Sequence, residues 1–265
     1  MQPSRIQQLF SRLKSEKRAA LVAYLVAGDP SLEKTPDFVA ALERGGADMI
    51  ELGVPFSDPI ADGPVIQRGA DRALKAGATV VKVLNVARKI RETSEIPIVL
   101  FTYLNPALRY GLEKLARDAK AAGCDGCLLT DVSVEEAESY VSVMRSAGLE
   151  TIFLATPTST TARLKLVAKY SSGFIYLVSR TGVTGERASL SSSLKPLYDA
   201  TRAVSDLPLA AGFGISTPEQ AGEVAKMTDG VIVGSAIVRL IEQGAGEKGL
   251  EEYARSLRRG MDAGK

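Results

Sequence analysis

The chain alternates between short, almost wholly apolar segments and longer segments in which apolar residues recur every three or four positions. The short segments have the length and composition of buried β-strands. They cover residues 21–28, 49–54, 97–103, 126–130, 151–156, 173–179, 208–214 and 230–235. Strands that are apolar on both faces and separated by helices are typical of a parallel sheet.

The segments between these strands predict amphipathic helices with one buried stripe. The repeating apolar positions are Val83, Val86, Ala87 and Ile90; Leu112, Leu115, Ala116 and Ala119; and Ala137, Tyr140, Val141 and Met144. Helix starts are predicted at Thr35, Ser133 and Thr217, the last two as capping boxes with Glu136 and Gln220. Eight strand–helix units predict an α/β fold, a single-domain (β/α)8 TIM barrel over residues 1–265.

Two segments depart from the regular repeat. Ile6, Leu9, Phe10 and Leu13 predict an extra N-terminal helix that closes the N-terminal mouth of the barrel. The interval between the second and third strands is about twice as long as the others, and it holds the loop GVPFSDPIADGP and two helical patterns. Because an insertion after a strand lies on the C-terminal face, where such barrels carry their sites, it is the first place to look for chemistry.

Composition excludes several classes of function. A net charge of +2 gives no basic surface for nucleic acid or for an anionic membrane. No apolar run could cross a bilayer and the first residues lack a secretory signal, so a cytoplasmic protein is predicted. The absence of histidine excludes His-ligated zinc and a His-activated nucleophile, and no metal site is predicted. Cys124 and Cys127 form an isolated CxxC, which we interpret as two small packing residues.

Glu51 is the only charged residue inside a predicted strand. Alternation places it opposite Ile50 and Leu52, so if those two pack on the helices, Glu51 points into the barrel. Burial would raise the pKa of its carboxyl group, which suits a group that acts as both acid and base near neutral pH. The alternative is a carboxylate held by backbone amides or paired with an arginine, and the pattern alone does not decide between them.

Two aspartates follow in the loop after this strand. Asp62 is a candidate to contact the substrate, but Asp62-Gly63-Pro64 also has the form of a helix start in which Asp62 is only a capping residue. Asp58 is equally explained as a turn residue before Pro59. Both alternatives stay open at the level of the sequence.

The last two predicted strands end in glycine-rich turns. Residues 212–215 end the seventh strand, and Gly234-Ser235 ends the eighth just before a short apolar helix. Glycines let backbone amides approach a ligand and a helix N-terminus favours an anion, so the two turns together predict a phosphate site. A third glycine-rich segment, residues 180–187, is a candidate mobile lid.

The positions of the lysines restrict the chemistry further. All lie in predicted helices, loops or termini, whereas a Schiff-base enzyme needs a lysine that projects from a strand end. Acid–base catalysis by carboxyl groups on a phosphorylated substrate remains. Tyr24, Tyr103 and Tyr176, all in predicted strands, are candidate hydroxyl contributors.

The run ELGVPFSDPIADGP, from Glu51 to Pro64, resembles the signature of the tryptophan synthase alpha chain family. The other motifs that follow the order of the family are Gly28-Asp29-Pro30, residues 179–185, residues 212–215 and Gly234-Ser235-Ala236. The resemblance spans nearly the whole chain, and the fourteen-residue run is highly specific. One mild departure is Tyr24, at a pocket position where the family pattern has Phe.

The resemblance implies a lyase of tryptophan biosynthesis that cleaves indole-3-glycerol phosphate by a retro-aldol step into indole and D-glyceraldehyde 3-phosphate. Glu51 is then expected to protonate indole C3 and to accept the hydroxyl proton of the glycerol chain. Asp62 is expected to accept a hydrogen bond from the indole N–H, and Tyr176 to lie close to the reacting side chain. The phosphate is expected at Gly185, Phe213, Gly214, Gly234 and Ser235, and the pocket at Tyr24, Tyr103 and Thr184.

The resemblance also implies a partner, the tryptophan synthase beta chain, in an α2β2 heterotetramer. No cofactor is expected in this chain, and pyridoxal phosphate is expected only in the beta chain, which condenses the channelled indole with L-serine. Asp58, Pro59, Asn105 and Pro106 are expected to face that partner.

Three alternatives remain. A stand-alone indole-3-glycerol-phosphate lyase would keep the same residues and release free indole. A sibling barrel that closes the indole ring of a carboxyphenylamino precursor relies on pocket lysines, which the predicted strand ends lack. A catalytically weak barrel that mainly activates its partner is disfavoured by the presence of both Glu51 and Asp62.

Overall fold

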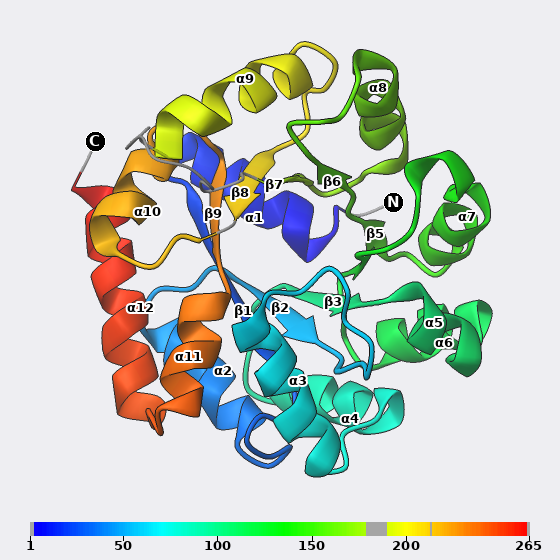
Figure 1. Ribbon diagram of the computed structural model, residues 1–265, viewed down its shortest axis with the longest axis vertical. Helices are drawn as coiled ribbons and strands as arrows, with labels where there is room; N and C mark the ends of the chain where they lie inside the picture. The colour runs from blue at the N-terminus through cyan, green and yellow to red at the C-terminus, as the bar shows by residue number, and fades with distance from the viewer. Residues whose placement is uncertain (1–2, 179–189, 213, 264–265) are drawn as a thin grey trace.

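The computed structural model describes residues 3–178, 190–212 and 214–263, and the strands of this part form one parallel sheet (Figure 1). The strand order is β5-β4-β3-β2-β1-β9-β8-β7-β6. The strands are β1 (Ala20–Val26), β2 (Met49–Gly53), β3 (Ile98–Thr102), β4 (Gly126–Leu129), β5 (Glu150–Thr151), β6 (Leu154–Ala155), β7 (Ile175–Val178), β8 (Leu209–Gly212) and β9 (Gly230–Val233).

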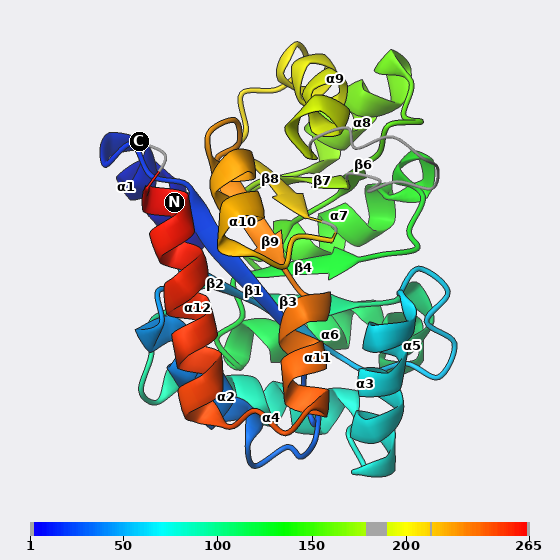
Figure 2. The same cartoon turned by 60° about the vertical axis from the view of Figure 1, so that its left-hand side comes forward.

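Helices surround the sheet on its outer side, apart from α1, which lies across one end of the barrel (Figures 1 and 2). The helices of the described residues are α1 (Arg5–Ser15), α2 (Thr35–Arg44), α3 (Pro64–Lys75), α4 (Val80–Arg91), α5 (Leu104–Tyr110), α6 (Leu112–Ala121), the 3-10 helix η1 (Val134–Glu136), α7 (Glu138–Ser146), α8 (Thr161–Tyr170), α9 (Leu190–Arg202), α10 (Pro218–Ala225), α11 (Ser235–Glu242) and α12 (Glu247–Asp262). The predicted insertion after the second strand is confirmed, since both α3 and α4 lie between β2 and β3.

The short strands β5 and β6 are the two halves of the predicted fifth strand. The amide of Ile152 donates to the carbonyl of Cys127 in β4, while the carbonyl of Phe153 accepts from the amide of Tyr176 in β7. The segment therefore changes its hydrogen-bonding side halfway along, which divides it in two and joins the ends of the sheet. The nine strands occupy eight positions, and the predicted (β/α)8 barrel is confirmed.

Helix α1 closes the N-terminal end of the barrel, as predicted. Its buried residues Ile6 and Phe10 pack in one cluster with interior residues such as Met49 and Phe174. Its N-terminus carries a capping box at Ser4, whose hydroxyl also donates to the Glu150 carboxylate over 2.6 Å. The closed end leaves the opposite, C-terminal end of the barrel as the open one.

A second core fills the space between the sheet and the surrounding helices. Ile50 and Leu52 are fully buried there, in one cluster with Val83 and Ala87 of α4. These outward-facing strand residues leave the alternate positions of β2 to face the barrel interior.

All three predicted helix starts are confirmed in position, since α2 begins at Thr35 and the N-cap residues of η1 and α10 are Ser133 and Thr217. Only the third has the predicted capping box, between Thr217 and Gln220. The hydroxyl of Thr35 donates to the carbonyl of Ser31 and accepts from the amide of Gly28, so it supports a loop instead of capping α2. Ser133 makes no capping hydrogen bond, because its hydroxyl is directed to the nearby Glu135 carboxylate. In both cases the side-chain hydroxyl bonds to another polar group instead of an amide at the helix start.

Two further predictions concern membranes and thiols. Within the described chain, no helix combines the length and apolar character that a bilayer crossing requires. Cys124 and Cys127 are buried, and burial raises the pKa of both thiols to about 12, so neither is a reactive thiolate near neutral pH.

Candidate active site

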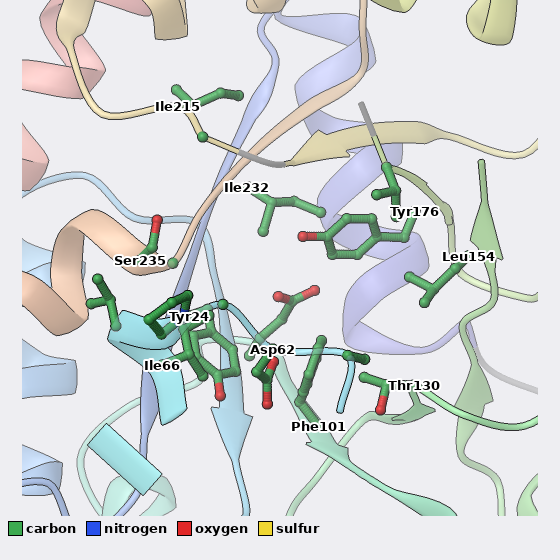
Figure 3. A pocket seen from close by; sticks show the side chains of 18 of the residues that line it. Tyr24, Asp62, Ile66, Phe101, Thr130, Leu154, Tyr176, Ile215, Ile232 and Ser235 are labelled. Carbon is green, nitrogen blue, oxygen red and sulfur yellow. The ribbon is translucent and has the colours of Figure 1, made fainter. Parts of the chain in front are cut away.

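A cavity of about 350 Å³ opens at the C-terminal end of the barrel. Its apolar wall comes from the strand interiors, with Phe101, Leu154 and Ile232 around it (Figure 3). The loops after β2, β8 and β9 complete the rim. This size and this mostly apolar lining suit a small organic ligand.

Glu51 lies on β2 at the base of this cavity, opposite Tyr24 of the neighbouring strand β1. Its side chain is 1% exposed, and its Oε1 has no hydrogen-bond partner among the described residues. Burial raises the pKa of the carboxyl group to about 8, and no described arginine forms an ion pair with it. Glu51 is therefore protonated at neutral pH, and the alternative of a paired or amide-held carboxylate is wrong.

Asp62 lies in the loop between β2 and α3 and also lines the cavity. The N-cap residue of α3 is Gly63, Pro64 is the first helical residue, and no side chain caps this helix. The Oδ2 atom of Asp62 instead accepts a hydrogen bond of 2.9 Å from the hydroxyl of Tyr103. The interpretation of Asp62 as a mere capping residue is therefore wrong.

The pKa of Asp62 differs from that of Glu51 although both side chains line one cavity. Burial raises the pKa of Asp62 to about 6, and the hydrogen bond from Tyr103 lowers it in part. At neutral pH Asp62 is ionised while Glu51 holds its proton. Two carboxyl groups whose environments separate their pKa values are a typical arrangement for an acid and an electrostatic stabiliser in one site.

Three tyrosines surround these carboxyl groups. Tyr24 and Tyr176 line the cavity, and burial raises the pKa of both hydroxyls well above 10, so they remain neutral donors. The Tyr176 hydroxyl points into the cavity (Figure 3). Tyr103 lies behind Asp62, outside the cavity lining, and also accepts from the amide of Ala61 over 3.1 Å. The expectation that Tyr103 lines the pocket is therefore corrected: it acts on the cavity through Asp62.

The glycine-rich turns form another part of the cavity lining. Gly214, Gly234 and Ser235 all line it, and Ser235 opens helix α11. No side chain caps the amides at the start of α11, and a Cβ at Gly234 would lie 3.2 Å from the ring of Tyr24. Free amides and the positive end of the helix dipole make this part of the lining suitable for an anion.

Three predicted site residues, Thr184, Gly185 and Phe213, lie outside the described residues. The candidate lid, residues 180–187, lies outside them too. Among the lining residues that the sequence prediction missed, the charged one is Arg239 on α11. Its spacing of four residues from Ser235 could have shown that the two share one face of the helix.

The residues predicted to face a partner follow the C-terminal ends of β2 and β3. Asp58 and Asn105 are exposed, in the loop after β2 and at the start of α5. Two large apolar side chains are exposed on the same elements, Ile60 by 85% and Leu108 by 54%. In the described part of the chain, no cluster of three or more Cys, Asp or Glu side chains could hold a metal ion.

Comparisons with known proteins identify the family of the chain. Residues 10–263 match the family model described as "Tryptophan synthase alpha chain". The chain is 65% identical to the tryptophan synthase alpha chain of Solibacter usitatus over 264 residues, which cover 98% of this chain and 99% of that one. It is 48% identical to the alpha chain of Geotalea uraniireducens over 263 residues, 98% of each chain.

Solved structures give the same result at lower identity. Tryptophan synthase subunit alpha from Legionella pneumophila superposes with a TM-score of 0.90 at 37% identity and covers 99% of this chain and 100% of its own. A structure of Mycobacterium tuberculosis tryptophan synthase superposes with a TM-score of 0.90 at 37% identity, over 98% of this chain and 99% of that one. The chain therefore belongs to the tryptophan synthase alpha chain family.

Proposed function

We propose that Glu51 and Asp62 perform, in this chain, the reaction of its family: the cleavage of indole-3-glycerol phosphate into indole and D-glyceraldehyde 3-phosphate. One observation carries the proposal. Two carboxyl groups with pKa values of about 8 and about 6 line the same cavity, and that cavity also reaches the start of a helix that no side chain caps. The apolar wall suits the indole ring, and the uncapped helix suits the phosphate.

Glu51 moves the proton in both halves of this reaction. Its acid form gives a proton to indole C3, which places a positive charge on the indole nitrogen. The resulting Glu51 carboxylate then takes the proton of the glycerol C3′ hydroxyl as the bond between indole C3 and C3′ breaks. The electron pair of that bond returns to the ring, and an aldehyde forms. The proton that Glu51 gave is thereby replaced, so no external acid, base or redox partner is needed.

Asp62 stabilises the intermediate charge. Its ionised carboxylate accepts a hydrogen bond from the indole N–H, and that bond strengthens when the nitrogen becomes positive. Tyr103 fixes the carboxylate in place through its 2.9 Å hydrogen bond. The Tyr176 hydroxyl points into the cavity (Figure 3), which supports a place for Tyr176 beside the reacting glycerol chain.

The proposal also assigns residues to a phosphate site and to a partner interface. We infer that Gly185, Phe213, Gly214, Gly234 and Ser235 hold the phosphate, with Thr184 beside the substrate and Tyr24 as part of the pocket. The surface of Asp58, Pro59, Asn105 and Pro106, together with the exposed Ile60 and Leu108, supports a partner interface.

We infer that this partner is a tryptophan synthase beta chain in an α2β2 assembly. It would carry the pyridoxal phosphate and receive the indole, while this chain works without a cofactor as one domain in the cytoplasm. The similarity to the M. tuberculosis tryptophan synthase structure supports this inference.

The test is an assay for indole release from indole-3-glycerol phosphate, with and without an added beta chain. We expect slow release by the chain alone and faster turnover, without free indole, when a beta chain and L-serine are present. Equal rates and free indole in both conditions would favour a stand-alone lyase. No cleavage in either condition, with stimulation of the beta reaction, would favour a purely activating subunit.

A further inference from the structure

The charge balance of the cavity raises a question about how a phosphate is held. The proposed substrate is an anion, yet two carboxyl groups, Glu51 and Asp62, line its cavity. The described glycine turns offer only backbone amides, and the hydroxyl of Ser235 is neutral. Arg239 is the one cationic side chain among the described residues that line this cavity.

The geometry of α11 directs Arg239 toward the phosphate end. Ser235 is the first residue of this helix, and Arg239 follows four residues later, on the same face and about one turn further along. Side chains of a helix lean toward its N-terminus, so the long guanidinium arm extends back over the turn that holds Ser235. Its exposure to solvent leaves it free to reach a ligand at that turn.

The acidic residue best placed to neutralise Arg239 is bound elsewhere. Glu242 is three residues further along the same helix, a spacing that permits an ion pair. Its Oε1 and Oε2 instead accept from Arg68 of α3 over 2.7 and 2.9 Å, and Oε1 also accepts from Arg72 over 2.8 Å. Arg239 itself forms no ion pair with any described carboxylate.

The arginines of α3 are themselves held in place. Arg72 makes two hydrogen bonds of 2.8 Å to the carboxylate of Asp29, whose side chain is fully buried. Helices α3 and α11 also approach closely, since a Cβ at Gly69 would lie 2.8 Å from Val238. This packing keeps Glu242 engaged with α3, so the positive charge of Arg239 remains available to the cavity.

We propose that Arg239 is a further substrate-binding residue, which contacts the phosphate group from the second turn of α11. The inference rests on the proposed function, because it needs a phosphorylated substrate in this cavity. Arg239 adds a full charge where the amides of Gly214, Gly234 and Ser235 add only dipoles. It therefore acts on binding and not on the proton transfers.

The test compares Arg239→Gln and Arg239→Lys with the wild-type chain. The Gln variant should raise KM for indole-3-glycerol phosphate by about three- to tenfold and leave kcat within about twofold, because the contact is a charged one near solvent. The Lys variant keeps a charge and should lie between the two. Salt should raise KM of the wild-type chain more than that of Arg239→Gln. Arg259→Gln on α12, an exposed arginine outside the cavity, is the matched control.

A binding measurement separates this inference from the proposed function. Titration calorimetry with glycerol 3-phosphate should show weaker binding to Arg239→Gln by about the same factor, whether or not the chain cleaves indole-3-glycerol phosphate. If the wild-type chain cleaves the substrate but Arg239→Gln keeps its KM and its glycerol 3-phosphate affinity, the assignment of Arg239 is wrong. If the Gln variant equally loses turnover of unphosphorylated indoleglycerol, Arg239 acts on the fold and not on the phosphate.

Discussion

Replacing Glu51 by Gln should remove activity and at the same time make the protein more stable at alkaline pH. Burial moves the pKa of this carboxyl group from its ordinary 4.5 to about 8. Between these two values the folded chain holds the proton and the unfolded chain releases it, so folding stability falls as pH rises. Each pKa unit corresponds to about 1.4 kcal/mol, so the loss reaches about 5 kcal/mol at most above pH 8. Gln has no proton to lose and escapes this cost.

Urea unfolding followed by circular dichroism, at intervals from pH 5 to pH 9, measures the effect. The difference in unfolding free energy between Glu51→Gln and the wild-type chain should shift in favour of the variant by several kcal/mol across this range. A change in unfolding free energy that the new amide causes equally at every pH does not affect the test, since the prediction concerns only the pH dependence. Glu252→Gln, at an exposed position of α12, controls for the loss of a carboxylate. Parallel curves for Glu51→Gln and the wild-type chain would refute the argument that Glu51 is buried without a partner.

Three further substitutions test other parts of the account. Asp62→Asn should lower kcat by about two orders of magnitude and change the unfolding free energy by less than about 0.5 kcal/mol; a matching loss of stability in thermal unfolding would restore the capping interpretation. Tyr103→Phe removes a hydrogen bond that lowers the pKa of Asp62, so the acid limb of the pH–rate profile should move up from about 6 by about one pH unit. An acid limb that does not move would contradict the role of this hydrogen bond. Phe10→Ala should lower the unfolding free energy in urea by about 3–5 kcal/mol and leave the kcat of the folded protein unchanged, because α1 closes the end of the barrel away from the cavity. A loss below about 1 kcal/mol would show that the packing of α1 against the barrel is dispensable.

The fold could be predicted from the sequence because its signals are local. The alternation of Ile50 and Leu52 around Glu51 predicted the inward direction of the carboxyl group, and the structure confirms it. The apolar spacing from Ile6 to Leu13 likewise predicted the N-terminal plug. The division of the fifth strand could not be predicted, because it depends on neighbours on both sides that only the closed barrel supplies.

The site depends more on contacts between distant residues. The two interpretations of Asp62 could not be separated from the sequence, because its partner Tyr103 is 41 residues away and approaches only when β3 pairs with β2. Arg239 was missed for a related reason. Its availability depends on Glu242 being bound by Arg68 and Arg72 of a different helix, and no local pattern reveals that.

In the proposed mechanism Glu51 delivers and recovers the proton while Asp62 stays ionised. The most direct test is the pH dependence of kcat/KM for indole release from indole-3-glycerol phosphate, measured for the wild-type chain and for Glu51→Gln. We expect a bell-shaped profile for the wild-type chain, with limbs near pH 6 and pH 8, and no turnover by the variant at any pH. A wild-type profile that stays level through pH 9, or a variant that retains appreciable turnover, would contradict this mechanism.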